Sequence, residues 1–410
     1  MITGGMLKGW SQSVTSPYSI SGVGDIEDRN IGRTAGMASV SAAMRSNVNI
    51  NTFNPASLTA MNPHLFLFEV GAKGRSSRFI QPGIDTTSQP SSDIAVKRVS
   101  LAYKATKKMA FGIGLLPFSN TNYNFTSNVP LPVGNESYVR TVEGTGSMQQ
   151  LYFTQALELD SNFSIGYTFS YLFGSQNQSL NYSSGSALNV TKINTSYYRN
   201  PYFKVGFQYY SKPQNKVQHR FGAYASMPVT LAGNSTYSVT DGSTIVQDSI
   251  VISNKPFKIP LMVTGGYSVT FNHSLTFGAD YTYNAWNSQT TSVAGLTLAP
   301  SNRVAIGFEK EKVLIKNNQF KSYYFQGGLF YENTYWKVNN NYVSDMGATI
   351  GGGTHIGKSL DGSGINVFGA VEFGKRGNSS KGQIADIYQQ FTIGVSFFNF
   401  WQKSPYLKYN

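Results

Sequence analysis

From Met61 onward, the chain repeats one pattern: about ten residues alternate between apolar and polar, and a polar, Gly-rich break follows. The clearest copy places apolar side chains at every second position, at Phe163, Ile165, Tyr167, Phe169, Tyr171 and Phe173. Alternation with a period of two predicts strands that have one apolar and one polar face. The apolar face is rich in aromatics and the other face is small or polar, which is typical of a transmembrane β-barrel.

The strands of a soluble sandwich also alternate, but they are usually shorter and bury more Leu and Val than Tyr and Phe. We count fourteen strands between turn signals, so the predicted fold is an all-β, 14-stranded antiparallel transmembrane barrel. The expected spans are 64–77, 94–105, 108–125, 137–158, 162–180, 196–211, 216–237, 248–270, 273–287, 300–312, 321–337, 342–357, 364–376 and 387–400.

The predicted connections alternate between short and long, as barrel topology requires. The long ones cover residues 80–93, 124–137, 181–195, 238–248, 287–301 and 377–386. An even number of strands places both ends of the barrel on one side, which we expect to be the periplasm of a Gram-negative bacterium. The chain is therefore predicted to lie in the cell outer membrane, with its long loops outside.

Composition agrees with a membrane protein that crosses with strands. Aromatic residues make up 14% of the chain, there is no Cys, and no run approaches the ~18 apolar residues of a spanning helix. The net charge of +13 would suggest nucleic acid for a soluble protein. No block of five like charges exists, however, and basic loops facing anionic lipid explain the charge in a barrel.

The region before the first strand has a different character. Residues 1–12 resemble the end of a secretion signal whose beginning is missing; the alternative is a true start and a cytosolic chain. Residues 13–62 are rich in Asn and small residues, and residues 32–44 permit a short helix. This region either forms a separate periplasmic module or folds back as a hatch that plugs the lumen, and its composition favours the hatch. Residues 63–402 form the barrel, and 403–410 a periplasmic tail.

Three motifs precede the barrel: Tyr18–Asp25 (YSISGVGD), Gly32–Gly36 (GRTAG) and Asn51–Leu58 (NTFNPASL). In this order and position they resemble the FadL-type family of outer-membrane transporters for long-chain fatty acids and other hydrophobic compounds. Within that family, the chain resembles in particular the members from Bacteroidota. The resemblance implies a hatch inside the barrel, with gate residues at Gly32, Gly36, Asn54, Pro55 and Ala56. The plainer interpretation is that the Asn-Pro-Ala corner only connects the hatch to the first strand.

Pro117 lies inside the third predicted strand, where it removes a ladder hydrogen bond and should kink or bulge the strand. The family resemblance implies a lateral opening in the wall at this kink, which we place at Gly112, Gly114 and Pro117. The alternative is a kink near the outer rim that has no transport role. Pro228 and Pro260 predict similar breaks elsewhere.

Strand parity turns a mixed set of charges toward the lumen: Glu69, Arg98, Lys204, Asp280, Arg303, Glu309 and Glu372. Both signs in one enclosed space favour ion pairs that anchor the hatch over a clamp for a ligand carboxylate. The four His are far apart in the sequence and do not match the spacing of a metal site, and no set of catalytic residues is recognisable. We therefore expect no metal, no cofactor and no enzymatic activity.

The sequence leads to one functional hypothesis and one rival. The hypothesis is passive uptake of long-chain fatty acids or other hydrophobic compounds, with a moving hatch and a lateral exit at the kink of the third strand. The expected partners are a hydrophobic ligand, outer-membrane lipid and the barrel-insertion machinery during assembly, without nucleic acid. The rival is a non-transporting barrel that partners a Bacteroidota protein-secretion machinery. Parity turns few apolar residues inward (Leu65, Leu67, Leu172 and Phe368), which weakens the uptake hypothesis.

Overall fold

The computed structural model describes residues 16–20, 22–80, 90–130, 137–184, 188–253, 256–286, 289–290, 295–316, 319–357 and 363–400. The predicted signal remnant at residues 1–12 and the predicted tail at 403–410 lie outside the described residues.

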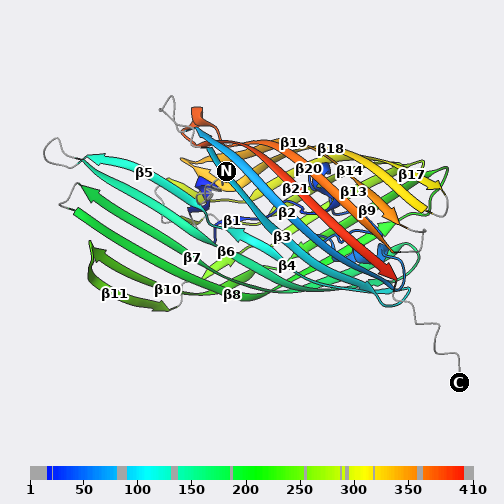
Figure 1. Cartoon of the computed structure of the whole chain (residues 1–410), viewed down its shortest axis with the longest axis horizontal. Helices are drawn as coiled ribbons and strands as arrows, with labels where there is room; N and C mark the ends of the chain where they lie inside the picture. Colours follow the sequence, from blue (N-terminus) through cyan, green and yellow to red (C-terminus); the bar gives the residue numbers. More distant parts are fainter. Residues whose placement is uncertain are drawn as a thin grey trace, which may run out of the picture.

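A single antiparallel sheet closes on itself into a barrel (Figure 1), and the prediction of fourteen wall strands is confirmed. The wall strands, in order around the barrel, are β2 (Leu65–Ile80), β3 (Pro90–Lys104), β4 (Met109–Asn120), β6 (Ser137–Glu158), β7 (Phe163–Ser184), β8 (Leu188–Tyr210), β9 (Val217–Ser226), β13 (Met262–Phe271), β14 (Leu275–Asn284), β17 (Ser301–Lys316), β18 (Gln319–Val338), β19 (Asn341–Gly357), β20 (Gly364–Arg376) and β21 (Ala385–Phe400). The ring closes where β2 pairs with β21, from Leu65 opposite Phe400 to Ile80 opposite Ala385.

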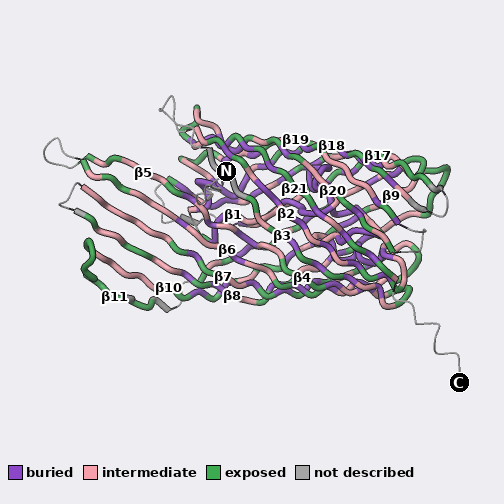
Figure 2. The backbone as a smooth tube through the Cα atoms, in the orientation of Figure 1, coloured by how far each residue is buried: buried purple, intermediate pink, exposed green. Residues whose placement is uncertain are grey.

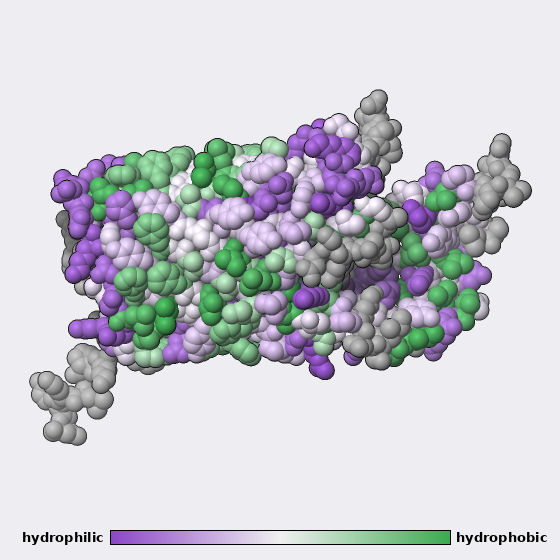
Figure 3. Space-filling view, turned by 180° about the vertical axis from the view of Figure 1, so that it is seen from behind, coloured by the Kyte–Doolittle hydropathy of each residue, from purple (hydrophilic) through white to green (hydrophobic). Residues whose placement is uncertain are grey.

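The two faces of the wall follow the alternation in the sequence. On β21, Phe391, Ile393 and Phe397 are exposed on the outer face, whereas Gln390 and Ser396 are buried on the inner face. Figure 2 shows buried and exposed positions alternating along the wall strands, and Figure 3 shows hydrophobic residues spread over the outside of the wall. An apolar outer face and a polar inner face are those of a barrel in lipid.

Two predicted strands are wrong in their extent because a proline interrupts each of them. The predicted strand 216–237 divides into β9 and β10 (Val229–Asp241), with Pro228 in the break. The predicted strand 248–270 divides into β11 (Thr244–Ser253), β12 (Phe257–Ile259) and β13, with Pro260 in the last break. Proline cannot donate to the ladder, so the wall strand ends there and the chain changes partners.

Three predicted loops are instead strands that run far beyond the wall. The outer parts of β6, β7 and β8 continue with β5 (Tyr123–Pro130), β10 and β11 into a curved sheet on the side away from the C-terminus (Figure 1). We call this the projecting sheet. On β7 the outward positions change from aromatic residues to Ser175, Asn177 and Ser179 after Phe173. The strand therefore leaves the apolar zone there but remains paired.

The N-terminal segment, residues 16–62, lies inside the barrel (Figure 1). It contains three 3-10 turns, η1 (Pro17–Ile20), η2 (Arg33–Met37) and η3 (Pro55–Ala60), and the two-residue strand β1 (Asp25–Ile26). Residues 32–44, which permit a short helix, form only the 3-10 turn η2, and Ala38 at its end has a φ of 51°. The Ala38 N–H bonds the Thr34 carbonyl and also donates to Thr349 Oγ1 on β19 at 2.8 Å, which ties the end of the turn to the wall.

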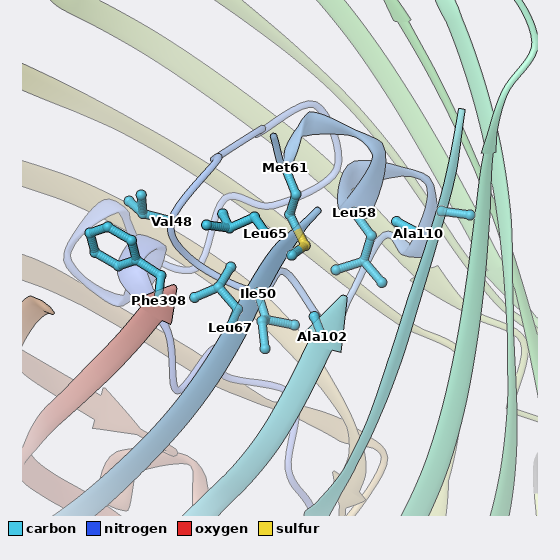
Figure 4. Close-up of a cluster of buried hydrophobic side chains, with 10 residues drawn as sticks. Val48, Ile50, Leu58, Met61, Leu65, Leu67, Ala102, Ala110 and Phe398 are labelled. Atoms are coloured by element: carbon cyan, nitrogen blue, oxygen red, sulfur yellow. The ribbon is translucent and has the colours of Figure 1, made fainter. Parts of the chain in front are cut away.

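One end of this segment packs on the wall through an apolar cluster (Figure 4). Val48, Ile50, Leu58 and Met61 come from the segment and contact residues of β2, β3, β4, β6 and β21. The wall contributes Leu65, Leu67, Ala102, Ala110, Ala156 and Phe398. Leu65 and Leu67, predicted to point inward, are thus covered by the segment.

The remaining elements are short: β15 (Gln289–Thr290), β16 (Leu296–Leu298) and η4 (Ser379–Lys381). Within the described ranges, no helix has the length and apolar character needed to cross a membrane. The same ranges contain no cluster of His, Asp or Glu suited to a metal ion.

Candidate functional site

A ring of inward-facing glycines receives the N-terminal segment. At each of these positions a Cβ would contact or overlap an atom of the segment, and most lie on a different wall strand from their neighbours: Gly71, Gly112, Gly166, Gly206, Gly222, Gly266, Gly278, Gly307, Gly328 and Gly351. Several are direct cross-strand partners, including Gly222 with Gly266 and Gly278 with Gly307. We call this set the glycine ring.

The glycines are required because backbone approaches backbone. A Cβ on Gly307 would lie 2.7 Å from the carbonyl oxygen of Met37, and one on Gly222 would overlap the carbonyl of Ala42. Backbone cannot move aside as a flexible side chain can, so these contacts hold the segment at a fixed depth.

The predicted gate residues lie at this ring. Asn54 is fully buried and caps η3 by accepting from the Ala56 N–H at 3.1 Å. Its Nδ2 donates to the carbonyl oxygens of Ala42 at 2.7 Å and Phe207 at 3.0 Å. Gly36 packs on Gly351. Asn54 therefore joins two parts of the segment to the wall, and whether this corner moves stays a prediction.

All seven predicted lumen charges lie on the inner side of the wall and contact the N-terminal segment. Glu69 pairs with Arg98 at 3.0 Å, accepts from the Ile50 N–H at 3.1 Å, and is fully buried. Arg98 donates to the Ile50 carbonyl. The remaining contacts are Asp280 with the N–H groups of Ser41 and Ala42, Arg303 with the Ala38 carbonyl, Glu309 with Arg33, Glu372 with Arg29, and Lys204 with the Thr52 carbonyl.

Arg29 is the centre of the densest ion-pair network. Its guanidinium lies 3.1 Å from Asp28, 3.1 Å from Glu332, 3.2 Å from Asp345 and 3.5 Å from Glu372, and only 6% of its side chain is exposed. A second centre is Arg33, which pairs with Glu309 at 2.8 Å and Glu311 at 3.1 Å. Buried charges of this kind are costly to separate, so the network resists withdrawal of the segment.

These neighbours also shift the ionisation of the segment. Burial alone would lower the pKa of Arg29, but the surrounding carboxylates raise it well above its ordinary value. Burial alone would raise the pKa of Glu27, but Lys73 and Lys97 hold it below its ordinary value. Both side chains therefore stay charged at neutral pH.

Several wall charges that complete the network are missing from our sequence prediction. Lys73 pairs with Glu27, Arg75 pairs with Asp386 at 2.6 Å, and Arg376 pairs with Asp25 at 2.5 Å. The parity that selected Glu69 also selects Lys73 and Arg75, which lie on the same face of β2. Consistent use of that parity would have found them.

The wall is incomplete between β3 and β4. Their ladder runs only from Lys104 opposite Ala110 to Val99 opposite Leu115, so the remaining part of β3 pairs with β2 alone. On β4 a register shift follows Pro117, between Pro117 and Ser119. The expected irregularity at Pro117 is therefore present, and Gly112 and Gly114 lie in the part of β4 that is still paired.

Strand β1 of the N-terminal segment occupies the free edge of β4 beyond this point. Asp25 pairs with Asn120 and Ile26 with Ser119. The Glu27 N–H donates to the Phe118 carbonyl at 2.9 Å, and the Ser119 hydroxyl donates to the Val23 carbonyl at 2.5 Å. The edge that an opening would leave bare is thus paired to the segment.

A cavity of about 120 Å3 remains between the segment and the wall. Phe53, Pro117, Tyr202, Tyr224 and Ile259 form the apolar part of its lining. The charged part consists of Lys204, Arg303, Glu27, Asp28, Asp280 and Glu332. The Lys204 ammonium lies 5.4 Å from the centre of the Phe53 ring and 5.7 Å from that of Tyr224. Among the described residues, no carboxylate forms an ion pair with it.

Comparison with known families identifies the chain. The family model described as BamG matches residues 3–410, nearly the whole sequence. The chain belongs to the BamG family. Among curated proteins, none matches it.

Solved structures similar to this BamG-family chain are FadL-type barrels. A FadL homologue from Pseudomonas aeruginosa is 13% identical with a TM-score of 0.61, covering 92% of this chain and 100% of that one. The toluene transporter TbuX from Ralstonia pickettii is 14% identical with a TM-score of 0.58, covering 90% and 97%. The toluene transporter TodX from Pseudomonas putida is 14% identical with a TM-score of 0.56, covering 92% and 100%.

At this identity the likeness establishes the fold. The chain has the β-barrel fold of these structures, and this fold points to an outer-membrane protein. The resemblance to members from Bacteroidota stays a prediction.

Proposed function

We propose that this chain is a closed barrel that acts as a non-transporting partner of a protein machinery in the outer membrane. One observation carries the proposal: the N-terminal segment occupies both the lumen and the free edge of β4. A solute would have to pass either through the lumen or through an opening in the wall beside β4. Either route opens only if buried ion pairs and backbone contacts of the segment separate.

The size of the remaining cavity supports the same conclusion. It measures about 120 Å3, whereas pockets that hold a drug-sized ligand measure roughly 300–1,000 Å3. A long-chain fatty acid therefore does not fit in the lumen as it stands.

The kind of machinery is suggested by the family. The BamG match hints at a relation to barrel assembly, and the sequence already named a protein-secretion machinery as the rival of transport. A barrel that stays closed can support such a machinery without leaking.

The test combines transport with association. The purified barrel in liposomes should take up no more labelled long-chain fatty acid than empty liposomes. The same barrel, extracted from native membranes in mild detergent, should migrate in blue native gels as a complex well above its own 44.9 kDa and contain a barrel-insertion or secretion component. Fatty-acid uptake together with a free monomer would overturn the proposal.

The second candidate is passive uptake of long-chain fatty acids or other hydrophobic compounds, with a hatch that moves and an exit at Pro117. It is favoured by the partly apolar cavity beside Pro117 and by Lys204, which faces that cavity without a carboxylate partner in the described chain. A ligand carboxylate would pair with this ammonium.

Uptake above the empty-liposome control would favour this candidate if two changes suppress it. One is Pro117→Ala, which permits a regular ladder on β4. The other is the Leu58→Cys/Gly112→Cys pair, which joins the segment to the wall and suits a chain without native Cys. The reduced form of the same pair is the matched control.

A further inference from the structure

The outer wall carries two apolar grooves of similar size. The first measures about 600 Å3 and crosses β13, β14, β17, β18 and β19. The second measures about 610 Å3 and crosses β6, β7, β8, β9 and β13. Both open toward the lipid, because their rims are exposed side chains such as Phe277 and Ile306 in the first and Ile165 and Phe207 in the second.

The first groove owes its shape to small outward residues between larger ones. Gly327 lies directly opposite Phe308, and Ala279 lies between Tyr267 and Ile306 on the neighbouring strands. Ala348 is the partner of Leu329 in the same manner. These positions form a floor bordered by aromatic and aliphatic side chains, a surface suited to an acyl chain.

A basic rim borders the first groove at the end of the barrel that carries the short turns. Lys310 follows Phe308 by two residues on the same outward face of β17, a separation of about 7 Å. Its ammonium donates to Ser274 in the β13–β14 turn at 3.0 Å, and Lys312 follows two residues later. Both lysines are exposed.

The β13–β14 turn beside this rim lies against the β8–β9 turn, whose strands belong to the second groove. The Lys216 carbonyl accepts from the Asn272 N–H at 2.8 Å, which holds the β8–β9 turn against the β13–β14 turn and its exposed His273. The carboxylates on this stretch of β17, Glu309 and Glu311, both pair with Arg33 of the N-terminal segment. The rim therefore presents ammonium groups whose nearest carboxylates are engaged elsewhere.

The second groove differs in where its charge lies. Beyond Ile165 and Phe207, the next outward residues of its own strands toward the same end are Phe163 and Tyr209, and the exposed lysines there, Lys212 and Lys216, lie in the β8–β9 turn. Hydrophilic residues gather at the short-turn end of the wall, at the left of Figure 3. The grooves match in size, but only the first has exposed lysines at this end on one of its own strands.

We propose that the first groove binds an anionic phospholipid, with one acyl chain lying against Ala279, Ala348 and the Phe308 ring that covers Gly327, and with the phosphate at Lys310 and Lys312. An acyl chain alone would fit either groove. Ammonium groups beside a groove select a lipid that carries net negative charge, because each lysine near an anionic headgroup adds favourable electrostatic energy. The proposed site is independent of whether the barrel transports or partners another protein.

The test uses the purified full-length barrel in a neutral detergent, supplied with phosphatidylglycerol or with phosphatidylcholine of the same chain length. Native mass spectrometry counts the lipids that remain bound. The wild type should retain phosphatidylglycerol more strongly than phosphatidylcholine. The Lys310→Gln/Lys312→Gln variant should weaken phosphatidylglycerol retention by roughly 25-fold, about fivefold for each lysine, and leave phosphatidylcholine retention unchanged.

Two controls test whether the lipid preference depends on these particular lysines and on this particular groove. Lys107→Gln/Lys108→Gln removes the same charge from the exposed β3–β4 turn and should leave the preference intact. Ala279→Phe fills the first groove and should abolish the preference, whereas Ala225→Phe fills the second groove and should not. Equal retention of the two lipids by the wild type, or an unchanged preference in Lys310→Gln/Lys312→Gln, would overturn the proposal.

Discussion

The half of the barrel that surrounds the N-terminal segment and the projecting sheet are built from the same strands, yet they are held together differently. Around the segment, β7 and β8 present Gly166 and Gly206 to backbone inside and aromatic rings to lipid outside. Beyond Phe173, the same two strands are mostly polar on both faces and are held by their ladder and by side-chain hydrogen bonds such as that from Asn181 to Thr191. Backbone pairing thus sustains a strand in either setting, but only the first half has a packed interior to lose.

The largest effect should follow from a side chain added to the glycine ring. Gly222→Val places a Cβ into the Ala42 carbonyl, so we expect the free energy of unfolding to fall by about 3 kcal/mol or more. Urea unfolding in lipid vesicles measures it. Gly265→Val, on the adjoining strand with nothing within 4 Å of its Cβ, is the matched control and should change little.

Removal of one partner from a buried ion pair should come next. Arg98→Met leaves the fully buried Glu69 without its cation, and we expect a loss of about 3–5 kcal/mol in the same assay. The double variant Glu69→Leu/Arg98→Met should recover much of that loss, because no charge is then stranded. A double variant no more stable than Arg98→Met would show instead that the loss comes from the missing pair and its contacts, and not from an unpaired Glu69 charge.

Acid should loosen the segment before it affects the wall. The carboxyls of Glu27 and Asp28 have a lowered pKa in the folded barrel, since Lys73 and Arg29 outweigh the opposing effect of burial. A released segment would bind more protons, so the stabilisation is present above about pH 4 and is lost as pH falls below it. The protection factors of amides in residues 25–37, which correct for slower intrinsic exchange in acid, should be high at pH 7 and fall below pH 4, while those in β20 and β21 stay high.

The smallest effect should come from the projecting sheet. Deletion of residues 239–249 removes the tip of the β10–β11 hairpin, where Ile245 and Val246 are 63–64% exposed and bury little surface. We expect the unfolding free energy to change by no more than about 0.5 kcal/mol. A loss comparable to that of Gly222→Val would mean that the two halves are not independent.

The wall strands around the N-terminal segment could be predicted from the sequence because their two faces differ chemically. The projecting sheet could not be predicted in this way. Alternation located the wall strands, and parity turned Glu69, Arg98 and Asp280 inward, because an apolar outer face makes the period visible. We expected loops at residues 124–137, 181–195 and 238–248. Both faces of these stretches are largely polar, so they show no alternation of apolar and polar residues.

Long-range contacts were the other limit. Nothing local in Asp25–Ile26 indicates that these residues pair with Asn120 and Ser119, because that pairing depends on where β3 ends. The glycine ring was present in the sequence as glycines within strands. The packing of these glycines against the N-terminal segment is apparent only in the structure.

The position of the N-terminal segment has a consequence for the order of assembly. The segment is made first, but Tyr18 hydrogen-bonds the carbonyl of Ile384, which lies 366 residues later. It is also enclosed by the β2–β21 ladder, the seam that joins the first wall strand to the last. Contacts of such high sequence separation form slowly. The contacts of the segment with the last wall strands can therefore form only after nearly the whole chain has been made, so the lumen is filled late in assembly.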